Sequence, residues 1–221
     1  MEKSAPSART RVQRFPNRGA YDDDTIAAIL DEGLVCHVGF VVDGQPFVLP
    51  TTYVRLGDNL YVHGAGANRM LNTLAGGVDA CVTVTLLDGL VLARSAFKHS
   101  MNYRSVVVLG RAQAVTDPAE KRRVLSALVD HVMPGRSGQV REPNDRELAA
   151  VLVLALPLSE ASAKIRRGPP IDEASDYALG CWAGELPLRL QPLPPVPDPR
   201  LQAGIEAPES LLNYRRGPSR P

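Results

Sequence analysis

The segment YVHGAGANR has the residue types of an anion-binding turn. An apolar strand runs into a turn of small residues and then into a helix start at Asn68. Small residues let backbone N–H groups approach an anion, the start of a helix favours negative charge, and Arg69 could add a bidentate phosphate contact. The residues alone leave open a phosphate site or a plain junction between a strand and a helix. The candidate binding residues here are His63, Gly64, Ala65, Asn68 and Arg69.

A second candidate is the segment LPTTY, in which two hydroxyl residues and a tyrosine follow a proline. Proline has no N–H to give to a neighbouring strand, so the backbone beside it is free to face a ligand. The alternative is an edge strand whose threonines face solvent. The candidate residues of this segment are Pro50, Thr51, Thr52 and Tyr53.

The third candidate, SAFKHSMNYRS, places many polar residues between two apolar strands. Loops carried by a rigid scaffold often hold functional residues, although an exposed hairpin crossing would have the same composition. Side chains alternate along a strand, so Tyr103 and Arg104 point to opposite faces and reach one pocket only across a bulge or a subunit interface. Arg104 is the inward residue of the two if Asn102 is also inward. The candidates are Ser100, Asn102, Tyr103, Arg104 and Ser105.

The composition excludes several classes of protein. A chain of 221 residues is long enough for one domain, and 44% hydrophobic with 22% charged residues is ordinary for a folded protein. A formal net charge of +1 provides no basic field for nucleic acid. No apolar run approaches the roughly 20 residues that span a bilayer, and the basic N-terminus lacks the apolar stretch of a signal peptide. We therefore expect a cytoplasmic protein with neither a nucleic-acid nor a membrane partner.

The cysteines and histidines show no metal-binding motif. The three cysteines are an odd number without CxxC spacing, and the four histidines have no HExxH spacing. No metal site is expected. The chain also lacks GxGxxG and GxxxxGK[ST], the usual dinucleotide and nucleoside-triphosphate fingerprints.

The pattern of apolar residues and turn signals predicts a mainly β chain. Asp43-Gly44 is a hairpin signal, and residues 78–93 are predicted to be a pair of strands around Asp88-Gly89. Helices are predicted from about Tyr21 to Gly33, in a short segment ending near residue 74, and from Asp117-Pro118 to about residue 132. Further strands are predicted over residues 34–42, 45–55, 59–63, 103–115 and 149–156.

These six or seven short strands lack the alternation of strands and helices that makes a parallel sheet. They predict an antiparallel β-barrel with peripheral helices. The predicted domain covers residues 18–190. A flexible basic arm, residues 1–17, precedes it, and a proline-rich tail, residues 191–221, follows it.

Several segments, in order along the chain, resemble the pyridoxamine 5′-phosphate oxidase-like flavin-binding proteins. More closely, they resemble the branch that includes the nitroimidazole-resistance proteins. The resemblance covers about residues 18–190. It is carried by RGAYD, HVGF, LPTTYVR, LYVHGAGANRML, ACVTVTLLDGLVLARSAFKHSMNYRSVVVLGRA, AKIRRGPP and WAGELPL.

The resemblance implies a split β-barrel and a homodimer with FMN bound in two clefts at its interface. LPTTYV matches the strand that lines the isoalloxazine ring, and His63-Gly64 falls where a strand end meets the phosphate and the ribityl chain. The family's phosphate-binding Ser-Arg-Lys turn becomes Asn68, Arg69 and Met70 here, so one cation is lost and one is kept.

Two further positions follow from the resemblance. Ser105 falls where the oxidase has a glutamine near the flavin. Trp182, the only tryptophan, would lie near the flavin of the partner subunit, or else be an ordinary core or interface aromatic. We recognise none of the motifs by which the oxidase binds pyridoxal phosphate.

The resulting hypothesis is an FMN-dependent oxidoreductase that acts on a small-molecule acceptor such as a nitro-aromatic or a quinone. The flavin would carry the redox chemistry, and no general acid or base stands out. One alternative is a haem-binding or haem-degrading protein on the same barrel, with His37 or His99 as the iron ligand. Another is a non-catalytic flavin carrier, and a deazaflavin is a variant of the cofactor.

Overall fold

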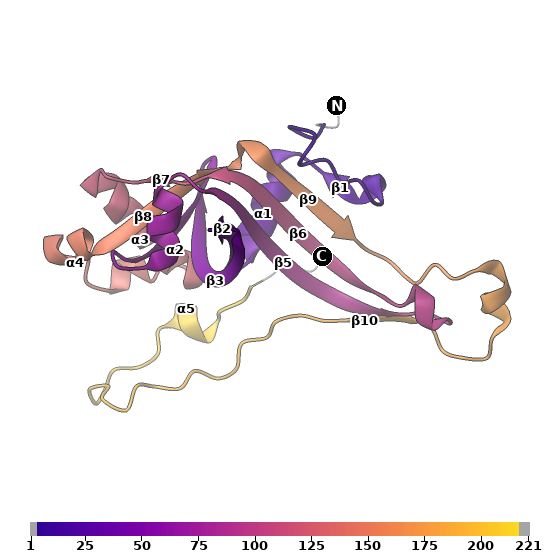
Figure 1. Ribbon diagram of the computed structural model, residues 1–221. Coiled ribbons are helices and arrows are strands. Elements are labelled where there is room, and N and C mark those ends of the chain that lie inside the picture. The colour runs from indigo at the N-terminus through magenta and orange to yellow at the C-terminus, as the bar shows by residue number, and fades with distance from the viewer. Residues whose placement is uncertain (1–3, 217–221) are drawn as a thin grey trace.

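The computed structural model describes residues 4–216 and is built around one antiparallel sheet. The strands follow the order β1-β9-β6-β5-β2-β3-β4-β8-β7, and β10 pairs with β5. The sheet curls but does not close, which makes the fold a split β-barrel with peripheral helices, as the sequence predicts (Figure 1). The strands are β1 Gly19–Ala20, β2 Val35–Val42, β3 Gln45–Leu56, β4 Asn59–Ala65, β5 Asp79–Leu92, β6 Ser100–Arg111, β7 Gln113–Ala114, β8 Val151–Pro157, β9 Ala161–Arg166 and β10 Gly184–Pro187.

Residues 4–216 form five α-helices, and the first three begin near where the sequence predicts. Asp22 and Asp117 are the N-caps of α1 and α3, and each side chain accepts a hydrogen bond from a backbone N–H of the first turn. Gly33 ends α1, and Asn68 caps α2. The helices are α1 Asp23–Glu32, α2 Arg69–Ala75, α3 Pro118–Val132, α4 Asp145–Ala150 and α5 Glu209–Leu212.

Two apolar clusters hold these elements together. The larger fills the barrel and includes Val38, Tyr53 and Leu154, which are fully buried. The smaller lies outside the barrel, where Val124 and Leu128 of α3 pack on the outer surface of β3, β4 and β8. Helix α3 therefore covers one end of the outer surface of β3 and leaves the other end bare.

The bare outer surface is apolar. Register pairs Val41 with Pro46 and Gly39 with Val48 across β2 and β3, so these side chains share a face. Val35, Val41 and Val48 on that face are 45%, 51% and 64% exposed, a degree that ordinary core strands do not show. This face, with Pro50 also on it, is called the open sheet face below.

Two sequence predictions are wrong in detail. The segment predicted as a pair of strands around Asp88-Gly89 forms one long strand, β5, over Asp79–Leu92. A β-bulge between Leu87 and Gly89 absorbs the irregularity, and Gly89 lies so close to the Leu186 carbonyl that a Cβ would be 2.9 Å from it. The prediction also omits β1, β9 and β10 and joins β6 and β7 into one strand, so the sheet has ten strands where six or seven were expected.

The ends of the described chain lie against the barrel. In the arm, the side chains of Ser7 and Arg9 bind the Glu160 carboxylate at 2.6 and 2.9 Å. In the tail, residues 188–208 have no regular structure, and Figure 1 shows them running back alongside the body after the long β5–β6 hairpin. Arg216 then donates hydrogen bonds to carbonyl oxygens of Glu32 and Gly33 at the end of α1. The predicted arm and tail extend beyond the described residues at positions 1–3 and 217–221. None of the described helices is long and apolar enough to cross a membrane.

Candidate functional site

An apolar cavity lies where α3 stops covering the sheet. Its volume is about 520 Å³, within the range of small-molecule sites. Leu125, Val129 and Val132 of α3 form part of its wall, and Thr52 and His63 reach it from the sheet. Because Tyr53 pairs with Val62, Thr52 and His63 are the next neighbours on the outer surface of β3 and β4. We call this the α3 cavity.

His63 in the α3 cavity has no partner in the described part of the protein. Its Nδ1 atom is buried without a hydrogen bond, a state that native proteins mostly avoid because an unsatisfied polar group costs free energy. Burial also lowers the pKa of His63, so the ring stays neutral near pH 7. A neutral imidazole without a protein partner, beside an apolar cavity, is suited to bind a metal centre of an apolar cofactor such as haem.

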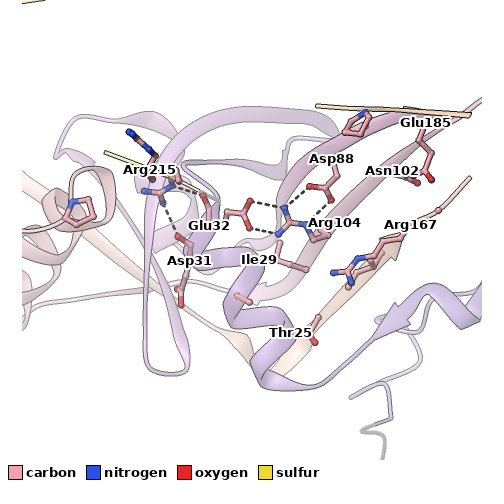
Figure 2. Close-up of a pocket in the computed structure, with 17 residues that line it drawn as sticks. Thr25, Ile29, Asp31, Glu32, Asp88, Asn102, Arg104, Arg167, Glu185 and Arg215 are labelled. Carbon is pink, nitrogen blue, oxygen red and sulfur yellow. Dashed lines mark hydrogen bonds and ion pairs between the residues drawn. The ribbon is translucent and has the colours of Figure 1, made fainter. Parts of the chain in front are cut away.

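A second, larger cavity of about 1080 Å³ lies between α1, β5, β6 and the chain end (Figure 2). Its centre is Arg104, which forms ion pairs with Glu32 and with Asp88 at 2.7 Å. The two carboxylates raise the pKa of Arg104 further above its usual range. The lining has four acidic and four basic residues, so the cavity has no net field for an anionic ligand such as a phosphate. They are Asp31, Glu32, Asp88 and Glu185, and Arg104, Arg167, Arg215 and Arg216.

Asn102 lies in the same cavity near Glu185 of β10 (Figure 2) and is buried, as the alternation from Arg104 predicts. Its amide accepts a hydrogen bond from Arg166 and donates one to Glu185. The side chains of Asn102 and Arg104 thus join the sheet to α1 and β10, and their polar atoms are occupied by protein partners.

The remaining candidates lie in several places. Tyr53 is in the barrel core, and its hydroxyl donates to the Leu30 carbonyl at 2.6 Å. The Ser105 hydroxyl donates to the Lys164 carbonyl at 3.3 Å. Trp182 is 69% exposed, so its ring is not part of the core of the described chain.

The turn that was predicted to bind an anion is exposed. The Asn68 side chain accepts from the Leu71 N–H at 3.1 Å, and the Arg69 guanidinium lies 5.1 Å from the centre of the Phe47 ring. Gly64 contacts this turn closely, since a Cβ there would be 3.0 Å from Leu71 Cδ1. A cation beside an aromatic ring and a small-residue backbone are compatible with a flavin phosphate next to a ring-binding strand.

A single chain therefore does not bring all the predicted residues together. Thr52 and His63 share the α3 cavity. Asn102 and Arg104 share the second cavity, of about 1080 Å³, and Pro50 lies on the open sheet face.

Comparison with known proteins identifies the chain's relatives. A family model described as pyridoxamine 5′-phosphate oxidase matches residues 22–165, well over half of the chain. The chain belongs to the pyridoxamine 5′-phosphate oxidase family. The expected family resemblance is thereby confirmed. A comparison with curated protein sequences found no match.

Solved structures within this family are similar over nearly the full length. The flavocytochrome Anf3 from Azotobacter vinelandii is 45% identical, with a TM-score of 0.91 over 97% of this chain and 100% of its own. The FAD and haem binding protein from Mycobacterium smegmatis is 37% identical, with a TM-score of 0.85 over 88% of this chain and 96% of its own. A protein from Bacteroides thetaiotaomicron that is described as a putative 5-nitroimidazole antibiotic resistance protein, 24% identical with a TM-score of 0.55 over 66% of this chain and 86% of its own, shares the fold.

Sequence reasoning alone missed the α3 cavity and the partners of Arg104. Glu32 is 72 residues from Arg104, and Asp88 lies on the neighbouring strand of the β5–β6 hairpin at a bulge that the turn signal hid. The cavity left a signal, because the apolar stripe of α3 is wider than the strip that packs on the sheet. Val124 and Leu128 are buried against the sheet, and the stripe continues through Val129 and Val132, which line the cavity.

Proposed function

We propose that this chain is a flavin- and haem-binding redox protein that passes electrons to a small-molecule acceptor. The observation that carries the proposal is the near-complete alignment with two relatives at 45% and 37% identity. One is described as a flavocytochrome and the other as an FAD and haem binding protein. The neutral, unpartnered His63 beside an apolar cavity supports the haem half. The flavin half is supported by the family, by Arg69 and by the open strand at Pro50 and Thr52.

We propose FAD as the flavin, in place of the FMN that the resemblance implies, because the Mycobacterium relative is described as binding FAD. The flavin supplies the electron-transfer chemistry when bound, and the protein holds it in position. The Arg69 guanidinium would pair with phosphate oxygens. The backbone around Pro50 would lie along the ring, because a proline there leaves no competing donor.

The test is the visible spectrum of the purified protein, followed by acid release and identification of each chromophore. We expect flavin bands together with a Soret band, and FAD among the released cofactors. FMN in place of FAD would restore the resemblance-based prediction. A protein that contains no flavin and takes up none when FAD or FMN is added would contradict the flavin half.

Replacing Arg69 with alanine is expected to weaken flavin binding. A charge-assisted contact to phosphate is worth roughly 1.5–3 kcal/mol, or about 10- to 150-fold in affinity. Fluorescence titration of the apoprotein measures the change. Arg111→Ala is the matched control, because Arg111 is also exposed but pairs with Asp79 on a different part of the sheet. Equal affinities for the two variants would argue against the phosphate role of Arg69.

We also propose that two copies of the chain associate through the open sheet face. Exposed valines there need a cover, and the candidate site residues lie in separate places on one chain, so a second copy would bring further groups to Pro50 and Thr52. The acceptor of electrons, which could be a nitro-aromatic or a quinone, would enter from the same face. In a non-catalytic flavin carrier, by contrast, the reduced flavin would not be reoxidised when such an acceptor is added.

Val48→Asp is expected to dissociate this homodimer and to release flavin, since a carboxylate at the centre of an apolar contact is left unpaired. Sedimentation velocity with absorbance at the flavin bands measures both effects at once. Ala119→Asp, an exposed position in the first turn of α3, serves as the control and should change neither. A monomeric Val48→Asp variant with its full flavin content would argue against a shared cleft.

A further inference from the structure

We propose that the α3 cavity holds the haem and that the His63 imidazole is an axial ligand of its iron. The proposal rests on the two-cofactor function above and assigns one of the two cofactors to one place in the fold.

The wall of the α3 cavity suits a porphyrin. Aliphatic side chains of α3 at intervals of three and four residues form one continuous apolar side of it. A porphyrin is a flat, largely apolar ring, and it buries most of its surface against side chains of this kind. The volume of about 520 Å³ falls within the usual range for sites that take molecules of this size.

Among the four histidines, only His63 combines a cavity wall with free nitrogens. His37 and His99 are exposed, and the His99 Nδ1 lies 3.0 Å from the Ser95 carbonyl. The His131 Nε2 lies 2.7 Å from the Gly33 carbonyl, and its ring packs against Tyr53. His63 forms no hydrogen bond within the described residues, and its Nδ1 is a buried donor or acceptor that remains to be satisfied. The sequence had offered His37 or His99 as the iron ligand, and the cavity favours His63 instead.

The rest of the lining supplies what a haem requires at its edges. Met133 is the only sulfur-containing residue in the cavity wall, and a thioether is a usual second axial ligand beside histidine. Arg136 and Arg141 lie at the cavity, where guanidinium groups can pair with propionate carboxylates. Arg141 already pairs with Glu147 at 2.7 Å, which leaves Arg136 as the cation without a carboxylate partner in this lining.

The position of His63 also separates the two cofactors. Arg69 lies over Phe47 and is not part of the α3 cavity wall. His63 faces α3, although the resemblance placed it beside the flavin phosphate. The cavity meets the sheet at Thr52, and the open sheet face continues from there through Pro50. Flavin on that face and haem in the α3 cavity would therefore be neighbours on the same outer surface of β3.

The test is a haemin titration of the flavin-loaded protein and of His63→Gly, followed by absorbance in the Soret region. We expect the parent protein to bind haemin with a sharp Soret band. In His63→Gly, we expect affinity to fall by roughly tenfold or more, since even partners that only orient a metal ligand cost 10- to 100-fold. Imidazole added to the variant should restore the parent spectrum, because it replaces the missing ligand without restoring the chain. His99→Ala is the matched control, because His99 is exposed and lies outside the α3 cavity and the open sheet face, and it should titrate as the parent does.

Each other outcome overturns the assignment in a distinguishable way. If the parent protein binds haemin and His63→Gly shows the same spectrum and affinity, His63 is not the ligand, and the two-cofactor function stands. If His63→Gly keeps its haem spectrum and loses its flavin, the cavity belongs to the flavin. If the parent protein takes up no haemin, this assignment and the haem half of the proposed function both fail. Retained flavin bands in His63→Gly show that the variant is folded.

Discussion

Replacing Arg104 with alanine is expected to lower the free energy of unfolding by about 3 kcal/mol. The substitution leaves the Glu32 and Asp88 carboxylates facing each other at the wall of the cavity, half-buried and without the cation that bridges them (Figure 2). The Arg104 side chain is only 13% exposed, so water cannot replace it fully. Urea denaturation measures the loss.

The control for Arg104→Ala is Arg111→Ala, which removes an ion pair whose side chains are 66% and 67% exposed. An exposed pair of this kind is worth about 0–1 kcal/mol. Adding Glu32→Gln to Arg104→Ala should recover part of the loss, because it removes the repulsion between the two carboxylates. If Arg104→Ala costs no more than Arg111→Ala, the link between α1 and β5 does not depend on this residue.

Gly33→Ala is expected to destabilise the fold by about 3 kcal/mol or more, the upper end for an overpacked core. A Cβ at this position would lie 2.5 Å from the Tyr53 hydroxyl and 2.5 Å from Val84 Cγ1. Both atoms are in the buried core, where neither side chain has room to move. The thermal unfolding midpoint and urea denaturation measure the effect.

Gly138→Ala is the matched control for Gly33→Ala, since a Cβ at Gly138 meets no atom within 4 Å. It should change stability by about 0.5 kcal/mol at most. Combining Tyr53→Phe with Gly33→Ala removes one of the two clashing atoms. The double variant should therefore lose less free energy of unfolding than the sum of the two single losses predicts. A near-neutral Gly33→Ala would mean that the turn after α1 is looser than its contacts indicate.

Local residue patterns predicted most of the fold, because its elements have clear ends. Asp22 and Asp117 are capping residues, and Asp43-Gly44 forms the tight turn between β2 and β3 with positive φ at both residues. The same kind of signal was misleading at Asp88-Gly89. There the dipeptide lies in a bulge, where Asp88 pairs with Arg104 of β6 and Gly89 makes room for β10, which is distant in sequence.

The candidate site was less predictable for the same physical reason. The sequence selected His63, but the direction of its side chain depends on the register of β3 with β4 and on where α3 packs. The resemblance placed His63 beside a flavin phosphate, and neither register nor packing is visible in a segment of nine residues. Arg104 was predicted to face inward with Asn102, and it does, although the carboxylates that hold it came from elements whose contact no local pattern reveals.

The pairing of β4 with β8 has a consequence for synthesis on the ribosome. β4 ends at Ala65, but its partner strand β8 begins only at Val151. One edge of β4 therefore has no hydrogen-bonding partner until more than two thirds of the chain has been synthesised. An unpaired apolar edge is a template for association with other nascent chains. The β5–β6 hairpin, which pairs residues close in sequence, can form long before this edge is closed. A nascent chain stalled between the two is therefore the species that most needs a chaperone.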